Sequence, residues 1–245
     1  MFDVVTFGET MLRLAAPPFR RLEQTSTLEV TVGGSEHSVA TGVCRLGLSS
    51  CWVSRLPDNA LGRMVRNKTR EFGVDTSHLV WAQGDRLGLY FVEYGASPRS
   101  SSVLYDRAQS AISRIQPGEV NWAEILNGAR LFHTSGITPA LSPSAASVTA
   151  EAMQAAKDAG CLVSYDLNYR AKLWSKEEAR ACQEPLMELV DILMTTEEDT
   201  ARVFGITGDD YNQVAAKLAE RFGFKVVTIT LRDNLSVWRN TWTAI

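Results

Sequence analysis

The sequence has 245 residues and lacks several features that mark particular classes of protein. It contains 25 lysines and arginines against 28 aspartates and glutamates, so it carries no basic excess with which to bind a nucleic-acid backbone. Its 17 glycines and 8 prolines are too few for a collagen-like or low-complexity chain, and 45% hydrophobic residues exclude wholesale disorder. The length predicts one large domain with a well-buried core, acting on a small molecule.

Cysteine is also scarce, and no cysteine stands in a CxxC pair or near a histidine at a metal-ligand spacing. The four are Cys44, Cys51, Cys161 and Cys182. This pattern predicts neither a structural zinc site nor a disulfide framework. Scattered thiols are usual in a reducing compartment, and residues 1–3 lack the basic and apolar regions of a signal peptide, so a cytoplasmic location is expected.

One uncharged stretch, residues 131–150, has the length of a membrane span. It contains Gly136, Pro139 and Pro143 together with several serines and threonines, which favour a loop and a helix start over a transmembrane helix. The sequence therefore predicts no membrane partner.

Short apolar runs alternate with amphipathic helical patterns along most of the chain. Strands are expected at residues 3–7, 51–55, 130–133, 162–166, 192–195 and 225–231, and helices at 36–46, 59–72, 144–159, 176–186 and 209–222. Regular alternation of strand and helix predicts crossover units, and therefore an α/β fold with a parallel sheet covered by helices on both faces.

Two stretches depart from this rhythm and alternate at strand spacing instead. They are residues 11–32 and residues 87–105, the second of which contains an aromatic, β-rich run around Tyr90. We interpret them as antiparallel strands that form one small sheet set off from the main one.

Polar residues and glycines follow several predicted strands, where the ligand crevice of an open α/β sheet lies. Gly33 and Gly34 directly precede a helix and can bring backbone N–H groups against an anionic or hydroxyl-rich ligand, although a glycine pair in this position is also a common plain turn. Asp166, Asn168 and Arg170 offer an acceptor, an amide and a guanidinium within five residues. The alternative for this cluster is a surface salt bridge with a helix N-cap at Asn168.

For the other candidate site residues, a purely structural role is also plausible. Tyr105 and Arg107 suit sugar hydroxyls and a carboxylate, but also an ordinary solvated strand end. His133 lies within an apolar strand end and is interpreted as a core histidine rather than a base. The acidic run 197–199 either favours a helix N-terminus or holds the magnesium of a nucleotide.

Several longer motifs run in order over nearly the whole chain. They are Thr6-Phe7-Gly8-Glu9, Val32-Gly33-Gly34-Ser35-Glu36, Gly88-Leu89-Tyr90, Tyr105-Asp106-Arg107, Ser135-Gly136-Ile137-Thr138-Pro139-Ala140-Leu141-Ser142-Pro143, and Asp166-Leu167-Asn168-Tyr169-Arg170 with Leu173-Trp174-Ser175. Together they resemble the PfkB (ribokinase-like) carbohydrate kinases. The last two motifs are similar to those of the family's 2-keto-3-deoxygluconate kinase branch.

The resemblance implies a ribokinase-like parallel sheet flanked by helices, with a small β lid built from insertions at about residues 11–32 and 87–105 of one domain spanning 1–245. It also implies that ATP, with Mg²⁺, phosphorylates a sugar acid, with 2-keto-3-deoxygluconate and its 6-phosphate as the expected substrate and product. Substrate-binding positions implied by the family are Gly34, Ser38, Tyr90, Tyr105, Arg107, Ile137 and Arg170. The implied nucleotide-binding positions are Asn168, Thr196 and Thr230, and the implied metal position is Asp199.

The sequence departs from the family pattern in three places. Ser38 stands where the family has a sugar-binding asparagine, and Leu231-Arg232 stands where it has Leu-Gly. The Gly-Ala-Gly-Asp signature, whose aspartate is the family's general base, does not occur before the last residue, Ile245. We therefore expect that aspartate to lie beyond Ile245, the C-terminal part of the fold to be missing, and the catalytic residue to be unassigned in this sequence.

Two alternatives remain beside the sugar-acid kinase, the first from the missing signature and the second from a likeness that holds at the level of the fold alone. One is a non-catalytic relative that binds a sugar acid, and the other is a kinase for another sugar such as fructose.

The predicted lid also bears on assembly. Lid strands such as residues 90–94 would expose a hydrophobic edge, and relatives often pair through this element. A homo-oligomer formed through the lid is expected.

Overall fold

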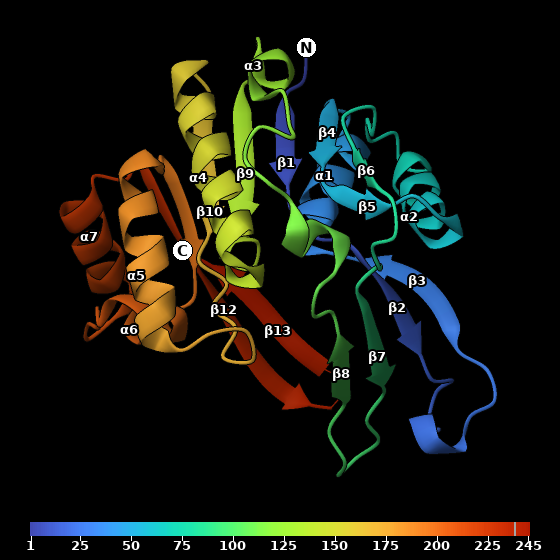
Figure 1. Cartoon of the computed structure of the whole chain (residues 1–245). Helices are drawn as coiled ribbons and strands as arrows, with labels where there is room; N and C mark the ends of the chain where they lie inside the picture. The colour runs from blue at the N-terminus through green and yellow to red at the C-terminus, as the bar shows by residue number, and fades with distance from the viewer. Residues whose placement is uncertain (238) are drawn as a thin grey trace.

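A seven-stranded sheet forms the centre of the α/β body in the computed structural model, which describes residues 1–237 and 239–245 (Figure 1). Its order is β13-β12-β11-β10-β9-β1-β4, and neighbouring strands are parallel except β12 and β13. The strands are β1 (Val4–Phe7), β4 (Ser50–Val53), β9 (Leu131–Ser135), β10 (Leu162–Asp166), β11 (Ile192–Thr195), β12 (Val226–Ser236) and β13 (Arg239–Ala244). The predicted α/β fold is confirmed.

The antiparallel hairpin of β12 and β13 was not predicted. The strand expected at residues 225–231 continues to Ser236, and the chain then returns along it as far as Ile245. The backbone of Ile245 pairs with that of Ile229 through two hydrogen bonds, of 3.0 and 3.1 Å. Ile245 therefore lies at an ordered edge of the sheet, beside the strand that carries the predicted nucleotide position Thr230.

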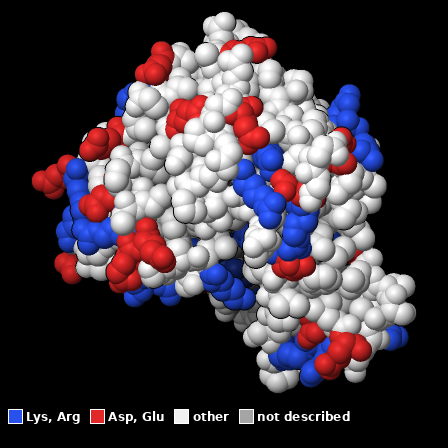
Figure 2. All heavy atoms as spheres, viewed as in Figure 1, with Lys and Arg blue, Asp and Glu red and all other residues white. Residues whose placement is uncertain are grey.

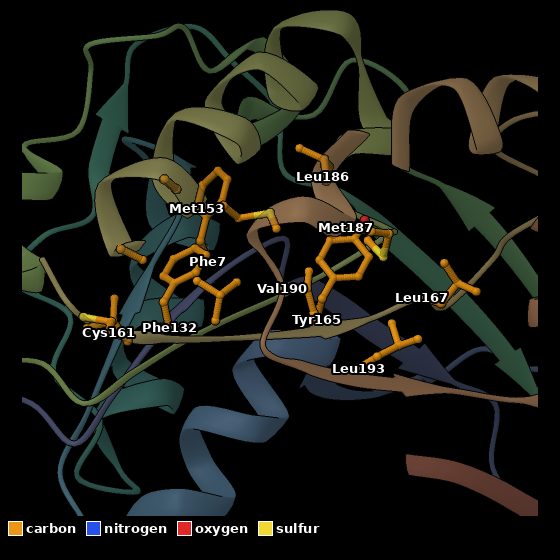
Figure 3. Close-up of a cluster of buried hydrophobic side chains, with 14 of the residues drawn as sticks. Phe7, Phe132, Met153, Cys161, Tyr165, Leu167, Leu186, Met187, Val190 and Leu193 are labelled. Atoms are coloured by element: carbon orange, nitrogen blue, oxygen red, sulfur yellow. The ribbon is translucent and has the colours of Figure 1, made fainter. Parts of the chain in front are cut away.

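Helices pack on both faces of this sheet because its central strands are apolar on both sides. Phe7 and Phe132 lie on the face that packs against α4, whereas Trp52 lies on the opposite face with Ala40 of α1 (Figures 1 and 3). The helices are α1 (Ser35–Arg45), α2 (Ala60–Arg70), α3 (Trp122–Leu126), α4 (Pro143–Asp158), α5 (Lys176–Leu186), α6 (Glu197–Phe204) and α7 (Tyr211–Phe222). Short 3₁₀ helices occupy η1 (Leu22–Gln24), η2 (Ala111–Arg114), η3 (Pro139–Leu141) and η4 (Met187–Leu189).

Local capping explains where the helices that border the site begin. The Ser175 hydroxyl accepts a hydrogen bond from Glu178 N and completes a capping box at the start of α5. The Thr196 hydroxyl accepts from Asp199 N at 3.0 Å and caps α6, which was not among the predicted helices. The acidic run 197–199 is therefore the first turn of a helix, where carboxylates are stabilised by the helix dipole.

The lid is a four-stranded sheet of order β3-β2-β7-β8, which projects from one edge of the body (Figure 1). It consists of β2 (Met11–Ala15), β3 (Glu29–Gly33), β7 (Leu89–Glu93) and β8 (Ser102–Asp106). The expected antiparallel pairing holds within each insertion, but β2 and β7 pair in parallel where the two insertions meet. A separate parallel pair joins β5 (Arg55–Pro57) to β6 (Val80–Ala82).

The order of the strands locates the ligand crevice of this fold. From β1 the chain adds β4 on one side and later β9 on the other, so the order reverses between β1 and β9. Open α/β sheets bind ligands beyond the carboxyl ends of the strands at such a reversal. Among the described residues, no helix combines the length and apolar character needed to cross a membrane.

Candidate functional site

A cavity of about 860 Å³ brings together three residues that the sequence predicted at the sugar. Tyr105 and Arg107 come from the end of β8, and Arg170 follows β10. Lys172 adds a third cation, and Asp106 is the one acidic residue on the wall described here. The other lining residues are Leu104, Ala108, Gln109, Ala140, Leu141, Tyr169, Ala171 and Leu173. A wall with this excess of positive charge suits an anionic ligand, and Figure 2 shows Lys and Arg side chains beside the hollow where the lid meets the body.

Close backbone packing at the base of the lid explains the glycine pair. A Cβ on Gly34 would lie 2.2 Å from the carbonyl oxygen of Glu9, and one on Gly33 would lie 2.1 Å from the Tyr90 hydroxyl. A side chain at position 34 would therefore displace the backbone, whereas one at position 33 would require the Tyr90 side chain to move. Tyr90 in turn stacks on Tyr105, with ring centroids 5.8 Å apart, so these two lid residues share one face of the sheet.

Arg107 does not stand free in the cavity wall. Its Nη2 donates to the carboxylate of Glu9, and the two side chains are 11% and 3% exposed. The Ser110 hydroxyl donates to the other carboxylate oxygen of Glu9 at 2.6 Å. The guanidinium also lies over the Tyr105 ring, 5.7 Å from its centroid. Arg107 is thus held by a buried ion pair and an aromatic face before any ligand binds.

Arg170 lies near Asp166 and Asp199, and its charge lowers the pKa of both. Desolvation and, after it, the nearby charge of Asp199 raise the pKa of Asp166 to about 6, against the lowering effect of Arg170. Desolvation likewise raises the pKa of Asp199, whose carboxylate accepts from Tyr169 N at 3.3 Å. Arg170 Nη1 donates a long hydrogen bond, of 3.4 Å, to the Tyr169 carbonyl. This guanidinium is exposed and can turn toward a ligand.

Glu36 completes a group of three carboxyls, with Asp166 and Asp199, that we call the carboxyl cluster. Complete burial raises the pKa of Glu36 to about 7, against hydrogen bonds that lower it. Those bonds come from the hydroxyls of Ser135, at 2.6 Å, and Thr138, at 3.0 Å. Glu36 therefore ties the first turn of α1 to the loop that follows β9.

The carboxylates in this region could supply one or two ligands to magnesium, as in complexes where a nucleotide provides the others. Within residues 1–237 and 239–245, no three acidic, histidine or cysteine side chains are grouped so that they could hold a metal ion. Magnesium commonly binds one or two carboxylates and fills its remaining positions with phosphate oxygens and water. Asp199, with Asp166 nearby, matches that requirement.

Of the predicted nucleotide positions, Asn168 and Thr196 follow the carboxyl ends of β10 and β11, and Thr230 lies within β12, just after its last pair with β11. Asn168 has a left-handed backbone, with φ of 40°, and its amide donates to the Ser35 hydroxyl at 3.4 Å. The alternative of an N-cap at Asn168 is wrong, because Ser175 caps α5. The Thr196 hydroxyl is engaged as the cap of α6, and the Thr230 hydroxyl donates to the Thr195 carbonyl at 3.3 Å.

Four predicted sugar positions lie outside the lining of this cavity, Gly34 and Tyr90 at the base of the lid among them. Ser38 is exposed on α1, where its hydroxyl donates to the Gly34 carbonyl at 2.7 Å, and it lines a neighbouring cavity of about 530 Å³. Ile137 is half-buried in the loop after β9, close in sequence to Ala140, which does line the main cavity.

The buried histidine behaves as the sequence interpretation expected. His133 is 1% exposed and its Nδ1 lies 3.1 Å from the Ser164 hydroxyl. Burial lowers its pKa to about 4, so the ring is neutral at physiological pH. This histidine belongs to the core beneath the site.

Sequence reasoning assigned no function to Glu9, Glu36 or Lys172. Glu9 and Glu36 occur in the motifs quoted above, but no role was assigned to them, because a local sequence pattern does not show that a carboxylate will be buried. Lys172 lies two residues after Arg170, and its amine is 5.6 Å from the centroid of the Tyr105 ring on the facing lid. The signal that could have found it was its place in the loop after a strand.

A parallel α/β sheet with a β lid over a cationic cavity at the strand-order reversal is the architecture of a small-molecule phosphotransferase of the sugar kinase type. The family described as pfkB family carbohydrate kinase matches residues 1–234, and the chain belongs to this family.

Named relatives give the family membership more detail. A 2-dehydro-3-deoxygalactonokinase of Haloferax volcanii is 41% identical over 97% of this chain and 74% of its own length. A 5-dehydro-2-deoxygluconokinase of Shouchella clausii is 34% identical over 89% of this chain and 67% of its own. The crystal structure of a 2-dehydro-3-deoxygluconokinase from Thermotoga maritima superimposes with a TM-score of 0.96 at 44% identity, covering 100% of this chain and 76% of that one. The predicted resemblance is therefore confirmed at the level of the family.

The relatives are longer than this chain, which bears on the unassigned base. The chain covers 74% of the Haloferax volcanii protein and 76% of the Thermotoga maritima one. That the family's general-base aspartate follows Ile245 stays a prediction. No catalytic residue is assigned among residues 1–245.

Proposed function

We propose that this protein binds a six-carbon sugar acid and directs the γ-phosphoryl group of ATP to its terminal hydroxyl, with 2-keto-3-deoxygluconate as the first candidate substrate. The observation that carries the proposal is the single cavity lined by Tyr105, Arg107 and Arg170. A planar guanidinium matches a carboxylate in two parallel hydrogen bonds, which a neutral sugar does not offer. The names of the relatives support an acid, because each of the three is named as a kinase of a dehydro-deoxy sugar acid.

The proposed role of each side chain follows from its position in the site. Arg170, which is exposed, would bind the substrate carboxylate, and Arg107 would approach it from the lid. Asn168, Thr196 and Thr230 would contact the nucleotide, and Asp199 would hold its magnesium, directly or through water.

The transfer itself exchanges one bond to phosphorus for another. A bond forms between the sugar oxygen and the γ-phosphorus, the bond to the β-phosphate oxygen breaks, and ADP leaves. The hydroxyl proton passes to a base that the family resemblance places beyond Ile245.

The raised pKa values near Arg170 support the placement of the nucleotide. Asp166 and Asp199 each lose hydration and repel one another's negative charge. A divalent cation between them and a triphosphate would lower both pKa values and neutralise the developing charge of the transferred group. Such a cation is expected to bind more tightly with nucleotide than without it.

Two assays separate the kinase from its alternatives. Titration calorimetry of the purified protein with 2-keto-3-deoxygluconate, 2-keto-3-deoxygalactonate and fructose tests the substrate class, and micromolar binding of an acid with no heat from fructose is expected. ADP release at saturating sugar acid and MgATP then tests turnover. Binding of the acid without ADP release would favour the non-catalytic relative, and no acid binding at all would refute the proposed function.

We also propose that the protein self-associates through the outer face of the lid. Val30, Leu14, Phe91 and Leu104 stand directly opposite one another on four adjacent strands and form one apolar row. Val30 is 45% exposed and Leu104 is 62% exposed, and Phe91 and Leu104 line a shared cavity of about 300 Å³. Light scattering should give at least a dimer, and Leu104→Lys should shift it toward monomer. A wild-type monomer would contradict this.

A further inference from the structure

Glu9 occupies the centre of the junction between the lid and the body. The chain crosses this junction four times, at residues 8–10, at Gly34, at residues 83–88 and at residues 107–110. Glu9 lies in the first crossing. Its backbone carbonyl would be 2.2 Å from a Cβ on Gly34, and its Oε1 would be 2.9 Å from a Cβ on Gly88, so it packs directly against the second and third.

The fourth crossing is bound to Glu9 by its side chain. Arg107 Nη2 and the Ser110 hydroxyl each donate to a different oxygen of the carboxylate. At 3% exposed, the carboxylate has lost almost all of its water, and it is stable there because both of its oxygens are hydrogen bonded and its charge is paired. Glu9, itself in the first crossing, thus packs against the second through its backbone carbonyl and contacts the third and fourth through its carboxylate.

The ion pair also leaves part of the guanidinium for a ligand. Arg107 lines the cavity, its plane lies over Tyr105, and within the described residues its buried Nε has no hydrogen-bond partner. A long arginine side chain loses considerable rotamer entropy when a ligand first orders it. A guanidinium that Glu9 already holds does not lose that entropy again on binding.

We propose that Glu9 is a positioning residue, which holds Arg107 in the direction required by an acidic ligand and locks the lid crossings in the same arrangement. This rests on the proposed function, because the benefit appears only with a ligand that carries a carboxylate. Glu9 does not contact the ligand itself, and it acts through Arg107.

The test compares four proteins: wild type, Glu9→Gln, Arg107→Ala and the double variant. Calorimetry measures the dissociation constants for 2-keto-3-deoxygluconate and for the neutral compound in which its carboxylate is reduced to an alcohol. Glu9→Gln keeps the size but removes the charge and replaces one accepting oxygen with an NH2 group, so the side chain can no longer accept from both Arg107 and Ser110. It should weaken binding of the acid at least tenfold while changing that of the neutral compound less than twofold. In the Arg107→Ala background, Glu9→Gln should have no further effect on the acid.

A matched control comes from the lid itself. Glu93 pairs with Arg99 at 16% and 30% exposure, away from the crossings, and Glu93→Gln should leave both dissociation constants within twofold of wild type. Tighter binding of the acid by Glu9→Gln would overturn the proposal, because Glu9 would then compete with the ligand for Arg107. Equal weakening of acid and neutral compound, or an undiminished effect without Arg107, would overturn it as well.

The unfolding free energy separates this inference from the proposed function. If wild type bound no sugar acid, the proposed function would fail on its own. The locked junction would still be tested, because urea unfolding of the same four proteins should show non-additive losses for Glu9→Gln and Arg107→Ala. Additive losses would overturn the locked junction whatever the ligand.

Discussion

Arginine and carboxylate meet at both ends of the cavity, yet the two regions are built in opposite ways. At the lid junction one guanidinium, Arg107, is paired with one carboxylate, Glu9, and both are buried. At the strand ends, Arg170 is exposed and lies near Asp166 and Asp199, which together with the buried Glu36 have raised pKa values. The lid junction therefore has equal numbers of positive and negative groups, whereas at the strand ends the carboxyl groups outnumber the cationic ones.

The charge balance of each region indicates the role to which it is suited. A desolvated ion pair whose partners are also hydrogen bonded has a defined geometry, so it can set the position of a lid and a binding group. A cluster with excess carboxyls responds to protons and to cations, because either relieves the repulsion among them. Fixed geometry at the lid junction and variable charge at the strand ends are therefore found in two separate regions of the molecule.

The largest effect should come from breaking the balanced pair. Arg107→Ala leaves the Glu9 carboxylate buried without its cation, and we expect a loss of about 3–5 kcal/mol in the free energy of unfolding. Arg63→Ala is the control, because Arg63 pairs with Asp58 at 3.0 Å where both side chains are well exposed, and it should cost at most about 1 kcal/mol. Urea unfolding measures both. Similar losses for the two variants would show that the buried pair contributes no more to the free energy of unfolding than the exposed one.

The next effect concerns pH and the carboxyl cluster. The folded-state pKa of Glu36 is raised from 4.5 to about 7, so the folded protein holds a proton that the unfolded chain releases. The stability that this contributes is complete below about pH 4.5 and is lost as pH rises to about 7, a change of about 3 kcal/mol. Asp166, with its pKa raised to about 6, acts in the same direction at lower pH.

Glu36→Gln should remove most of that dependence. The free energy of unfolding, measured in urea at several values between pH 5 and pH 8, should fall with pH in wild type and be much flatter in the variant. Glu177→Gln, at an exposed position in the first turn of α5, should keep the wild-type slope. If Glu36→Gln kept that slope too, the pH dependence would have another origin.

A moderate effect is expected at Arg170. Arg170→Ala should weaken the binding of acidic substrates by about 1.5–3 kcal/mol, the usual value of a hydrogen bond to a charged group, and should leave neutral sugars nearly unaffected. Arg170→Lys should restore part of the affinity, because it keeps the charge without the planar fork. A uniform loss for acids and neutral sugars alike would favour the alternative of a kinase for another sugar.

The smallest effect is expected at Ser38, where the family has asparagine. The Ser38 hydroxyl is exposed and bonds back to the Gly34 carbonyl, outside the main cavity. Ser38→Asn should therefore change sugar-acid affinity by less than about 1 kcal/mol, as is usual for exposed positions. A gain of tenfold or more in calorimetry would mean that this residue reaches the substrate.

Local patterns predicted most of the elements because their causes are local. The helix at residues 176–186 coincides with α5, since a capping serine and an apolar stripe both mark it. Helix α6 was missed because its eight residues give little periodicity, although its acidic first turn was noted. The parallel pairing of β2 with β7 was missed for a different reason: residues 11–15 and 89–93 are far apart in sequence, and no local signal specifies their mutual direction.

For the candidate site too, the sequence predicted some features and the tertiary structure decided the others. The amino-acid order was enough to nominate Tyr105, Arg107 and Arg170, because motif spacing records which residue types follow which strands. The charge state and partners of those residues depend on desolvation and on contacts across about a hundred positions, such as Glu9 with Arg107 or Glu36 with Ser135. Burial decides whether a carboxylate is a solvated charge, an ion-pair partner or a held proton, and burial exists only once the chain has folded.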